Sequence, residues 1–468
     1  MMFYGVSVMS FIRYKKRDGC RYAYEVTAYW DKELKKPRQK AVYLGVVNAD
    51  GEIQKTSTEK LQLDFGDAFL LHEFIKQQEL FPTLTKVGCD ELLPLIFYRL
   101  CSQSAMYNAS TWFSGNYANV ILKNPNLSSQ NISRTLKYLG REQIQQEFFK
   151  QYLNTINHVD SAIIIDATSL PNNSHVGFNA WGYDDGGIGK QLRMLCVLDS
   201  KTKLPLFYRY LPGNMLDIST LQTTMAELRL MGVKISSALL DAGYFSETNV
   251  HELYEQKINF LTRMPKSRTI YKNLIKQHSH NLESLKYATK YGERAIFVKC
   301  KAIDLFGHKA YAYMVLDPIR KGKELQKLIM DHLADSEIEP TETAGCGVMV
   351  LVSSNKLAPQ NVVSNYYARQ AVEQVFGFYK DDLQLLPLRA HSDDTIRGYM
   401  FLLFITLIIF IELRKALNDK FTVEQALLIT RNLKCKIFDD KIVIAELTKQ
   451  QKEVFALCNI IVPTICGI

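Results

Sequence analysis

The sequence is poor in the residues that mark fibrous, disordered or disulfide-stapled proteins. Its 468 residues include only 24 glycines and 13 prolines, which excludes a collagen-like or broadly disordered chain. The nine cysteines form no Cys-x-x-Cys pair and are odd in number, so neither a zinc ribbon nor a disulfide framework is predicted. The economical interpretation is a protein of the reducing cytoplasm.

Long hydrophobic runs are also scarce. The most apolar stretch, residues 399–411, is well short of the ~20 residues that a helix needs to cross a bilayer. We therefore expect a buried core helix there and no membrane partner. Near the amino terminus the positive cluster at residues 13–17 follows the apolar start, which is the reverse of the order in a signal peptide.

Positive charge is present in excess, and it is unevenly placed. The net charge is +9, and basic residues concentrate in two segments, 1–40 and 262–301. The second segment also contains several tyrosines, and positive charge beside aromatic rings suits a polyanion whose bases can stack. In that segment we select Lys266, Arg268 and Lys272 as candidate DNA contacts, with solvated lysine-rich loops as the alternative.

The order of the predicted elements indicates a mixed α/β protein. Hydrophobic residues make up 47% of the chain, and its length suits two to four domains. Apolar residues at three- and four-residue spacing predict helices at Ala68–Gln77, Asp90–Gln103, Ser128–Leu139 and Glu142–Thr155.

After these helices, a meander of three strands, then a helix and further strands, predicts an RNase H-like core with an insertion before its last helix. The predicted regions are a small basic β unit (1–58), a helical region for recognition of DNA ends (59–158), the core (159–268 and 346–416), a basic insertion subdomain (269–345) and a C-terminal α/β region (417–468).

Two aspartates follow apolar, strand-like runs. Asp166 ends the run in IIIDATSL, and Asp241 ends the run in ALLDAGYF. The carboxyl ends of strands are where open α/β sheets bind ligands, and adjacent strands would bring both carboxylates together. Hard divalent cations such as Mg²⁺ need only a few carboxylate oxygens, so two or three acids suffice for a site. A single aspartate in this position is otherwise a turn former or a helix N-cap.

A predicted helix over about residues 360–380 carries a polar stripe. Tyr366, Arg369, Glu373 and Lys380 fall within about 60° of one another around the helix axis, and mostly apolar residues occupy the other side. The stripe thus presents a carboxylate with two cations and a phenol. The alternative is a solvated face with an ordinary Arg369–Glu373 ion pair.

These motifs together resemble a known family. The spacing Tyr366-x₂-Arg369-x₃-Glu373-x₆-Lys380 is similar to the YREK signature of one large branch of bacterial insertion-sequence transposases of the DDE class. Asp166 and Asp241, the latter in a D-x-G-[YF] setting, resemble the first two catalytic acids of that family. Residues 212–217 match its G-N-x-x-D element, and the long separation before Glu373 fits members with a β-rich insertion.

The resemblance implies DNA transposition, with hydrolysis of phosphodiester bonds at the element ends and transfer of the 3′-hydroxyl into target DNA. It implies that Asp166, Asp241 and Glu373 hold two Mg²⁺ ions, with Mn²⁺ as an alternative. Tyr366, Arg369 and Lys380 would contact DNA phosphates. The implied partners are the terminal inverted repeats, the target DNA and a second copy of the chain, in a nucleoid-associated, cytoplasmic setting.

Two other functions stay open at this point. A glycosidase could use Asp166 and Asp241 as its pair of carboxylates, but it gives no reason for cations beside Glu373. A catalytically inactive, transposase-derived protein could bind DNA only. The chain also departs from the family in one respect, because its three tryptophans (30, 112 and 181) all lie outside the insertion, where family members place one to stack on a flipped base.

Overall fold

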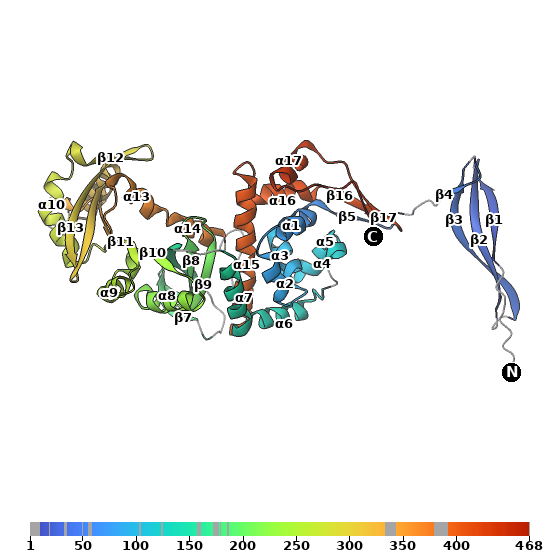
Figure 1. Ribbon diagram of the computed structural model, residues 1–468, viewed down its shortest axis with the longest axis horizontal. Helices are drawn as coiled ribbons and strands as arrows, with labels where there is room; N and C mark the ends of the chain where they lie inside the picture. Colours follow the sequence, from blue (N-terminus) through green and yellow to red (C-terminus); the bar gives the residue numbers. More distant parts are fainter. Residues whose placement is uncertain are drawn as a thin grey trace.

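A computed structural model gives an elongated molecule of mixed α/β structure, as predicted (Figure 1). Along its length lie the outer strands of a large sheet, the centre of that sheet, a helical body and a small separate sheet. The structure describes residues 10–17, 19–31, 35–48, 50–54, 59–102, 104–122, 125–156, 161–171, 177, 179–184, 187–332, 343–378 and 392–467.

The centre of the large sheet has the strand order and directions of an RNase H fold. Three antiparallel neighbours, β9, β8 and β6, are followed by β10 and β11, which run parallel to β6. This order, β9-β8-β6-β10-β11, confirms the predicted RNase H-like core. The strands are β6 (Ser161–Pro171), β8 (Gly187–Asp199), β9 (Pro205–Pro212), β10 (Ile235–Leu240) and β11 (Asn259–Arg263), with β7 (Ala180–Asp184) paired to the start of β8.

Apolar runs explain why these strands lie at the centre. Ile163, Ile164 and Ile165 in β6 are completely buried, and so are the last apolar residues of β8 before Asp199. A strand that is covered on both faces reads as a continuous apolar run, without alternation. The connections after β9 and β10 contain α8 (Leu221–Leu230) and α9 (Glu247–Glu255).

The insertion continues the same sheet. Strand β15 pairs antiparallel with β11, and β14, β13 and β12 follow outward in that order. The β-rich segment is therefore hydrogen-bonded to the core through β15. Its elements are α10 (Thr269–His278), β12 (Ala288–Tyr291), β13 (Arg294–Leu305), β14 (His308–Leu316), α11 (Pro318–His332) and β15 (Val348–Ser353).

The helical region and the C-terminal region share one sheet. Strand β5 (Leu61–Asp64) pairs with β16, so segments about 370 residues apart lie side by side. The four helices predicted between residues 68 and 155 are confirmed within two residues at each end. The elements are α1 (Gly66–Lys76), α2 (Phe81–Lys86), α3 (Leu92–Cys101), α4 (Ala109–Ser114), α5 (Ala118–Ile121), α6 (Ser129–Leu139), α7 (Glu142–Thr155), α16 (Val423–Arg431), β16 (Lys434–Ile437), β17 (Lys441–Ile444), α17 (Lys449–Leu457) and β18 (Ile465–Gly467).

Helix α15 (Asp393–Leu417) joins this body to the large sheet. It is longer than the apolar run that predicted it, and by length and composition alone it could cross a membrane. However, 72% of its most apolar window is buried inside the protein. Phe401 packs edge-on against Phe148 of α7, and Phe404 contacts both Phe149 of α7 and Tyr208 of β9. The helix is therefore a core helix, as predicted.

A small antiparallel sheet stands apart from the rest of the described chain (Figure 1). Its strand order is β1-β2-β3-β4, and its central strand β2 is paired along its whole length. The strands are β1 (Ser10–Arg17), β2 (Cys20–Asp31), β3 (Lys36–Val47) and β4 (Ile53–Gln54). The predicted small basic β unit is thus present.

Two glycines allow α15 and α6 to pack backbone against backbone. A Cβ atom at Gly398 of α15 would lie 1.7 Å from the carbonyl oxygen of Leu136, and one at Gly140 would lie 1.9 Å from that of Asp394. Since no side chain fits at such distances, the two helices approach this closely only because both positions are glycine.

This close approach predicts a large cost for a single methyl group. Gly398→Ala should lower the free energy of unfolding by about 3 kcal/mol, because the backbone of α6 must move to make room. Gly322→Ala is the matched control: this glycine lies in α11 with nothing within 4 Å of its Cβ position. The control should gain roughly 0.5–1 kcal/mol from helix propensity. Urea denaturation of both variants measures the difference, and equal stabilities would contradict the proposed packing.

Candidate active site

Asp166 and Asp241 lie side by side on neighbouring strands of the core. Asp241 follows the last residue of β10, as predicted, but β6 continues to Pro171, so Asp166 lies within its strand and not at its end. Strands β6 and β10 run parallel, and their register pairs Ile165 with Leu240, so the next residues are the two aspartates. The backbone N–H of Ala167 donates to Oδ1 of Asp166 over 2.9 Å, which fixes this carboxylate. The sequence prediction that adjacent strands bring these acids together is confirmed.

The third acid comes from a helix that is broken where the sequence predicts it to be continuous. The chain forms α13 (Pro359–Tyr367) and α14 (Gln370–Gly377), with a turn at residues 368–369. Glu373 lies in the first turn of α14, and its side chain is 54% exposed. The two-helix arrangement corrects the predicted uniform stripe, because Tyr366 is buried and Arg369 lies at the junction.

Arg369 lies among all three carboxylates. Its Nη1 atom is 2.7 Å from Oδ2 of Asp166, and its Nη2 atom is 3.3 Å from Oε1 of Glu373 and 3.6 Å from Oδ1 of Asp241. The sequence alternative of a simple Arg369–Glu373 pair is therefore too limited, since that pair is one of three. One positive charge is shared among three negative charges, which leaves a local excess of two negative charges.

Tyr366 contacts the same cluster through its hydroxyl group. Its side chain is buried, and its hydroxyl donates a hydrogen bond of 3.1 Å to Oδ1 of Asp241. Burial, and secondly the charge of Asp241, raise the pKa of Tyr366, so the phenol keeps the proton that it donates. The guanidinium of Arg369 also lies 5.6 Å from the centre of the Tyr366 ring. In this state Tyr366 orients Asp241.

Burial dominates the titration of Asp166. Loss of solvent raises the pKa of Asp166 to about 6; the ion pair with Arg369 opposes this shift, and the neighbouring charge of Asp241 adds to it. The pKa of Arg369 is also raised, because the three acids outweigh the effect of its own burial. Desolvated acids this close together are typical of sites that bind a positively charged group.

A neighbouring ion pair supports the site, and the sequence analysis did not single it out. Arg193 of β8 lies 2.8 Å from Asp217, which is the aspartate of the G-N-x-x-D element. Burial raises the pKa of Asp217, while Arg193 opposes that shift. A Cβ atom at Gly243 would lie 2.7 Å from Oδ2 of Asp217, so the glycine of the D-x-G segment makes room for this carboxylate. The G-N-x-x-D and D-x-G segments could be recognised in the sequence, but the contact between them could not.

The other predicted DNA contacts lie outside this cluster. Lys266 pairs with Glu324 over 3.1 Å, and Arg268 donates to the backbone oxygen of Phe245. Lys272 is an exposed residue of α10. Two of the three basic side chains thus have partners within the protein, which weakens the case for all three as phosphate contacts. Lys380 lies outside the described residues.

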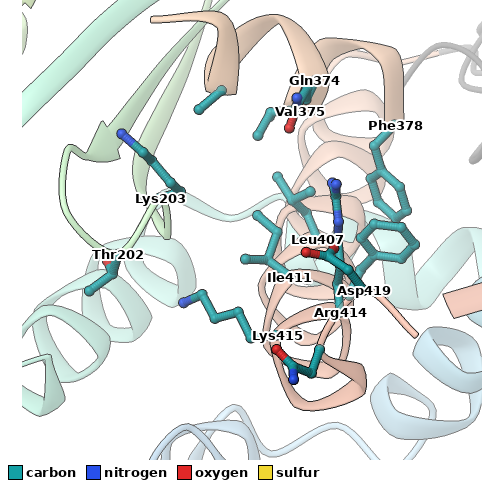
Figure 2. Close-up of a pocket in the computed structure, with 13 residues that line it drawn as sticks. Thr202, Lys203, Gln374, Val375, Phe378, Leu407, Ile411, Arg414, Lys415 and Asp419 are labelled. Carbon is teal, nitrogen blue, oxygen red and sulfur yellow. The ribbon is translucent and has the colours of Figure 1, made fainter. Parts of the chain in front are cut away.

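Helix α14 also borders a cavity of about 380 Å³ on its other side (Figure 2). Gln374, Val375 and Phe378 line it from α14, and Leu407, Ile411 and Arg414 line it from α15. Their spacing along α14 places them on the face opposite Glu373 and Arg369. The cavity is therefore separate from the carboxylate cluster.

The carboxylates fit a divalent cation in their chemistry but not in their present positions. Among the described residues, no three acidic, histidine or cysteine side chains are grouped closely enough to hold a metal ion as they stand. At this cluster Arg369 lies between the acids. The oxygens that converge on its guanidinium are nonetheless the hard ligands that Mg²⁺ and similar ions prefer. The residues therefore fit such a cation once Arg369 moves aside.

A match to a protein family agrees with this chemistry. A family model described as "Transposase DDE domain" matches residues 157–409, more than half of the chain. A solved structure of the piggyBac transposase, in a synaptic complex with hairpin DNA, is similar with a TM-score of 0.37 and 12% identity over 84% of this chain and 76% of that chain. No curated protein matches the sequence. The match to the DDE domain model, which covers more than half of the chain, therefore assigns the protein to its family.

The raised pKa of Asp166 predicts a pH-dependent stability. Because the folded pKa of about 6 exceeds the unfolded value, the folded protein binds more protons between about pH 4 and pH 6. Its stability relative to Asp166→Asn should therefore fall by about 2 kcal/mol from pH 4.5 to pH 7.5. Denaturation in EDTA at both pH values measures this change. Asp331→Asn, a substitution at an exposed position of α11, is measured alongside as the control variant. A pH-independent difference for Asp166→Asn would contradict the assignment.

Proposed function

The chain belongs to the family of DDE-domain transposases, and from this membership we propose that it cleaves phosphodiester bonds at the ends of a DNA element and transfers the 3′-hydroxyl into target DNA. The observation that carries the proposal is the convergence of three carboxylates, from β6, the end of β10 and α14, on one guanidinium. DNA transposition is the general activity of the family. The assignment to Asp166, Asp241 and Glu373 is the part that we add.

Transposases of this family generally use divalent metal ions. We propose two Mg²⁺ ions, with Mn²⁺ as an alternative, held by Asp166, Asp241 and Glu373. When bound, such a pair of cations activates a water or a 3′-hydroxyl as the nucleophile and stabilises the leaving oxygen. The chain supplies carboxylate oxygens from two neighbouring positions of the sheet, Asp166 and Asp241, and from Glu373 of α14.

The three acids differ in burial and in the contacts that hold them, and this supports different roles. Asp166 is buried and hydrogen-bonded to the backbone of Ala167, so it provides a fixed position. Asp241 is held by the hydroxyl of Tyr366. Glu373 is the most exposed of the three and lies on a separate helix, so it is the ligand that can adjust.

Arg369 is the positioning residue of the site in this proposal. Without cations it neutralises part of the charge on the acids and keeps them close together. If divalent cations were held by the acids, the guanidinium would be free to contact a phosphate of the DNA end. The predicted phosphate contact of Arg369 is thereby retained, but it becomes conditional on metal binding.

The finer predictions from the sequence remain part of the proposal. They are membership of the YREK branch of bacterial insertion-sequence transposases, recognition of terminal inverted repeats by residues 59–158, a homodimer on DNA, a nucleoid-associated location, and phosphate contacts by Tyr366 and Lys380. Lys266 is in an ion pair with Glu324 and Arg268 donates to the backbone oxygen of Phe245, which leaves Lys272 as the best-supported DNA contact of the insertion. The family match argues against the glycosidase alternative.

Loss of any one acid should abolish cleavage. Asp166→Ala, Asp241→Ala and Glu373→Ala should each reduce Mg²⁺-dependent nicking of supercoiled plasmid carrying the element ends to below a few per cent, because a two-metal site tolerates no missing ligand. Binding of end DNA in EDTA should persist. The control Glu247→Ala removes an exposed acid of α9 and should cleave normally. An inactive parent protein would instead support the DNA-binding alternative.

The role of Arg369 can be tested without any cleavage assay. Removing its guanidinium leaves the acids without their counter-charge, so Arg369→Gln should bind Mn²⁺ roughly ten-fold more tightly in the absence of DNA, the effect of one charged hydrogen bond. Electron paramagnetic resonance of free Mn²⁺ measures this affinity. The control Arg320→Gln removes an arginine that pairs with Glu324 in the insertion, and it should leave the Mn²⁺ affinity unchanged. Weaker or unaltered Mn²⁺ binding by Arg369→Gln would refute the proposal that Arg369 and metal ions compete for the three carboxylates.

A further inference from the structure

The small sheet β1–β4 leaves aromatic side chains in solvent on both of its faces. Trp30 is 59% exposed, Tyr29 44% and Tyr43 40%, although the strand β2 is paired along its whole length. Only Ala23 and Val26 of its described hydrophobic residues are nearly inaccessible. A sheet of this size has too little core to be stable with both faces bare, so we expect a partner to cover at least one of them.

The strand register separates the side chains into two faces. Arg13 of β1 lies opposite Tyr24 of β2, which lies opposite Tyr43 of β3, so these three share one face. We call it the aromatic face; by the same alternation it comprises Phe11, Arg13, Lys15, Arg17, Cys20, Tyr22, Tyr24, Val26, Ala28, Trp30, Pro37, Gln39, Ala41, Tyr43 and Val46. The opposite face carries Tyr14, Arg21, Glu25, Tyr29, Asp31 and Arg38, among others.

Contacts across the aromatic face hold its rings in a row. The ring of Tyr43 lies 5.3 Å from that of Tyr24 and 6.1 Å from that of Tyr22. Lys15 lies over the Tyr24 ring, and Arg13 lies over the ring of Phe11. The face therefore offers fixed aromatic rings with cations directly beside them.

Charge identifies the class of partner: both faces of the described sheet are basic, and the two faces differ in that only the opposite face also carries acids. The described residues 10–48 contain nine Lys and Arg but only two acids, Glu25 and Asp31. Both acids lie on the opposite face, where Asp31 pairs with Arg38. Within the described residues the aromatic face thus carries cations without any acid. Such a surface repels a second copy of itself and attracts a polyanion.

We propose that the aromatic face binds an unpaired strand of DNA. Rings standing on a sheet can stack on base faces only when the bases are not already stacked within a duplex, and the adjacent Arg13 and Lys15 then meet the phosphates. Duplex DNA offers phosphates but no free base faces. The surface therefore favours single-stranded over double-stranded DNA, a preference that the catalytic cluster does not explain.

The test compares the two faces in the full-length chain. Fluorescence anisotropy with a labelled oligothymidylate and with a duplex of the same length, in EDTA, gives both affinities. In an Asp241→Ala background, Trp30→Leu and Tyr43→Leu should each weaken single-strand binding by about 5- to 100-fold and leave duplex binding within about two-fold. Tyr43→Phe should bind like the parent, because it keeps the ring.

Tyr29→Leu is the matched control, since it removes a ring of similar exposure from the opposite face. It should leave single-strand binding unchanged. Equal losses for Tyr29→Leu and Tyr43→Leu, equal losses for single strand and duplex, or no loss at all would overturn the proposal. So would a dimer, detected by light scattering, that dissociates on Trp30→Leu. Because no cleavage is measured, these outcomes are independent of the proposed catalytic function.

Discussion

Three neighbouring carboxylates repel one another, and this site depends on the single guanidinium that lies among them. Asp166 is almost completely buried, so its charge is expensive unless a cation is close. Arg369 supplies that cation and reaches Asp241 and Glu373 at the same time. The site is therefore organised before any ligand binds. The same guanidinium also leaves the acids closely spaced and short of positive charge, which is the condition under which a stronger cation would displace it.

The fold places these groups with few elements. Parallel pairing of β6 and β10 fixes two acids at neighbouring positions, and the turn between α13 and α14 directs Arg369 and Glu373 toward them. Tyr366, one turn earlier, is buried and fastens α13 to Asp241. The insertion adds strands to the far side of β11 without interrupting this arrangement.

Much of this site could be predicted from the sequence, and the reasons are local. Apolar runs that end on an aspartate identified β6 and β10, because buried parallel strands have that pattern. Helix periodicity located Glu373 and Arg369, but it could not reveal the turn at residues 368–369, which tertiary contacts impose. Nor could it predict that Tyr366 is buried or that Arg193 pairs with Asp217. These contacts join distant segments, and no local pattern records them. The pairing of β5 with β16 was not predicted for the same reason.

That pairing has a consequence for the synthesis of the protein. Lys434 and Asp64, an ion pair at the β5–β16 junction, are 370 residues apart in the chain. On a ribosome, the helical body that begins at β5 thus cannot be completed until almost the whole polypeptide has emerged, whereas the strands of the RNase H-like core are complete much earlier. The helices of the N-terminal half are synthesised first, and their apolar faces stay incompletely covered until α15, α16 and β16 have been made. The RNase H-like core therefore lies between the two halves of the helical body in the sequence, and it is complete before that body is. A chain that stops before residue 434 would have a complete RNase H-like sheet beside an incomplete helical body.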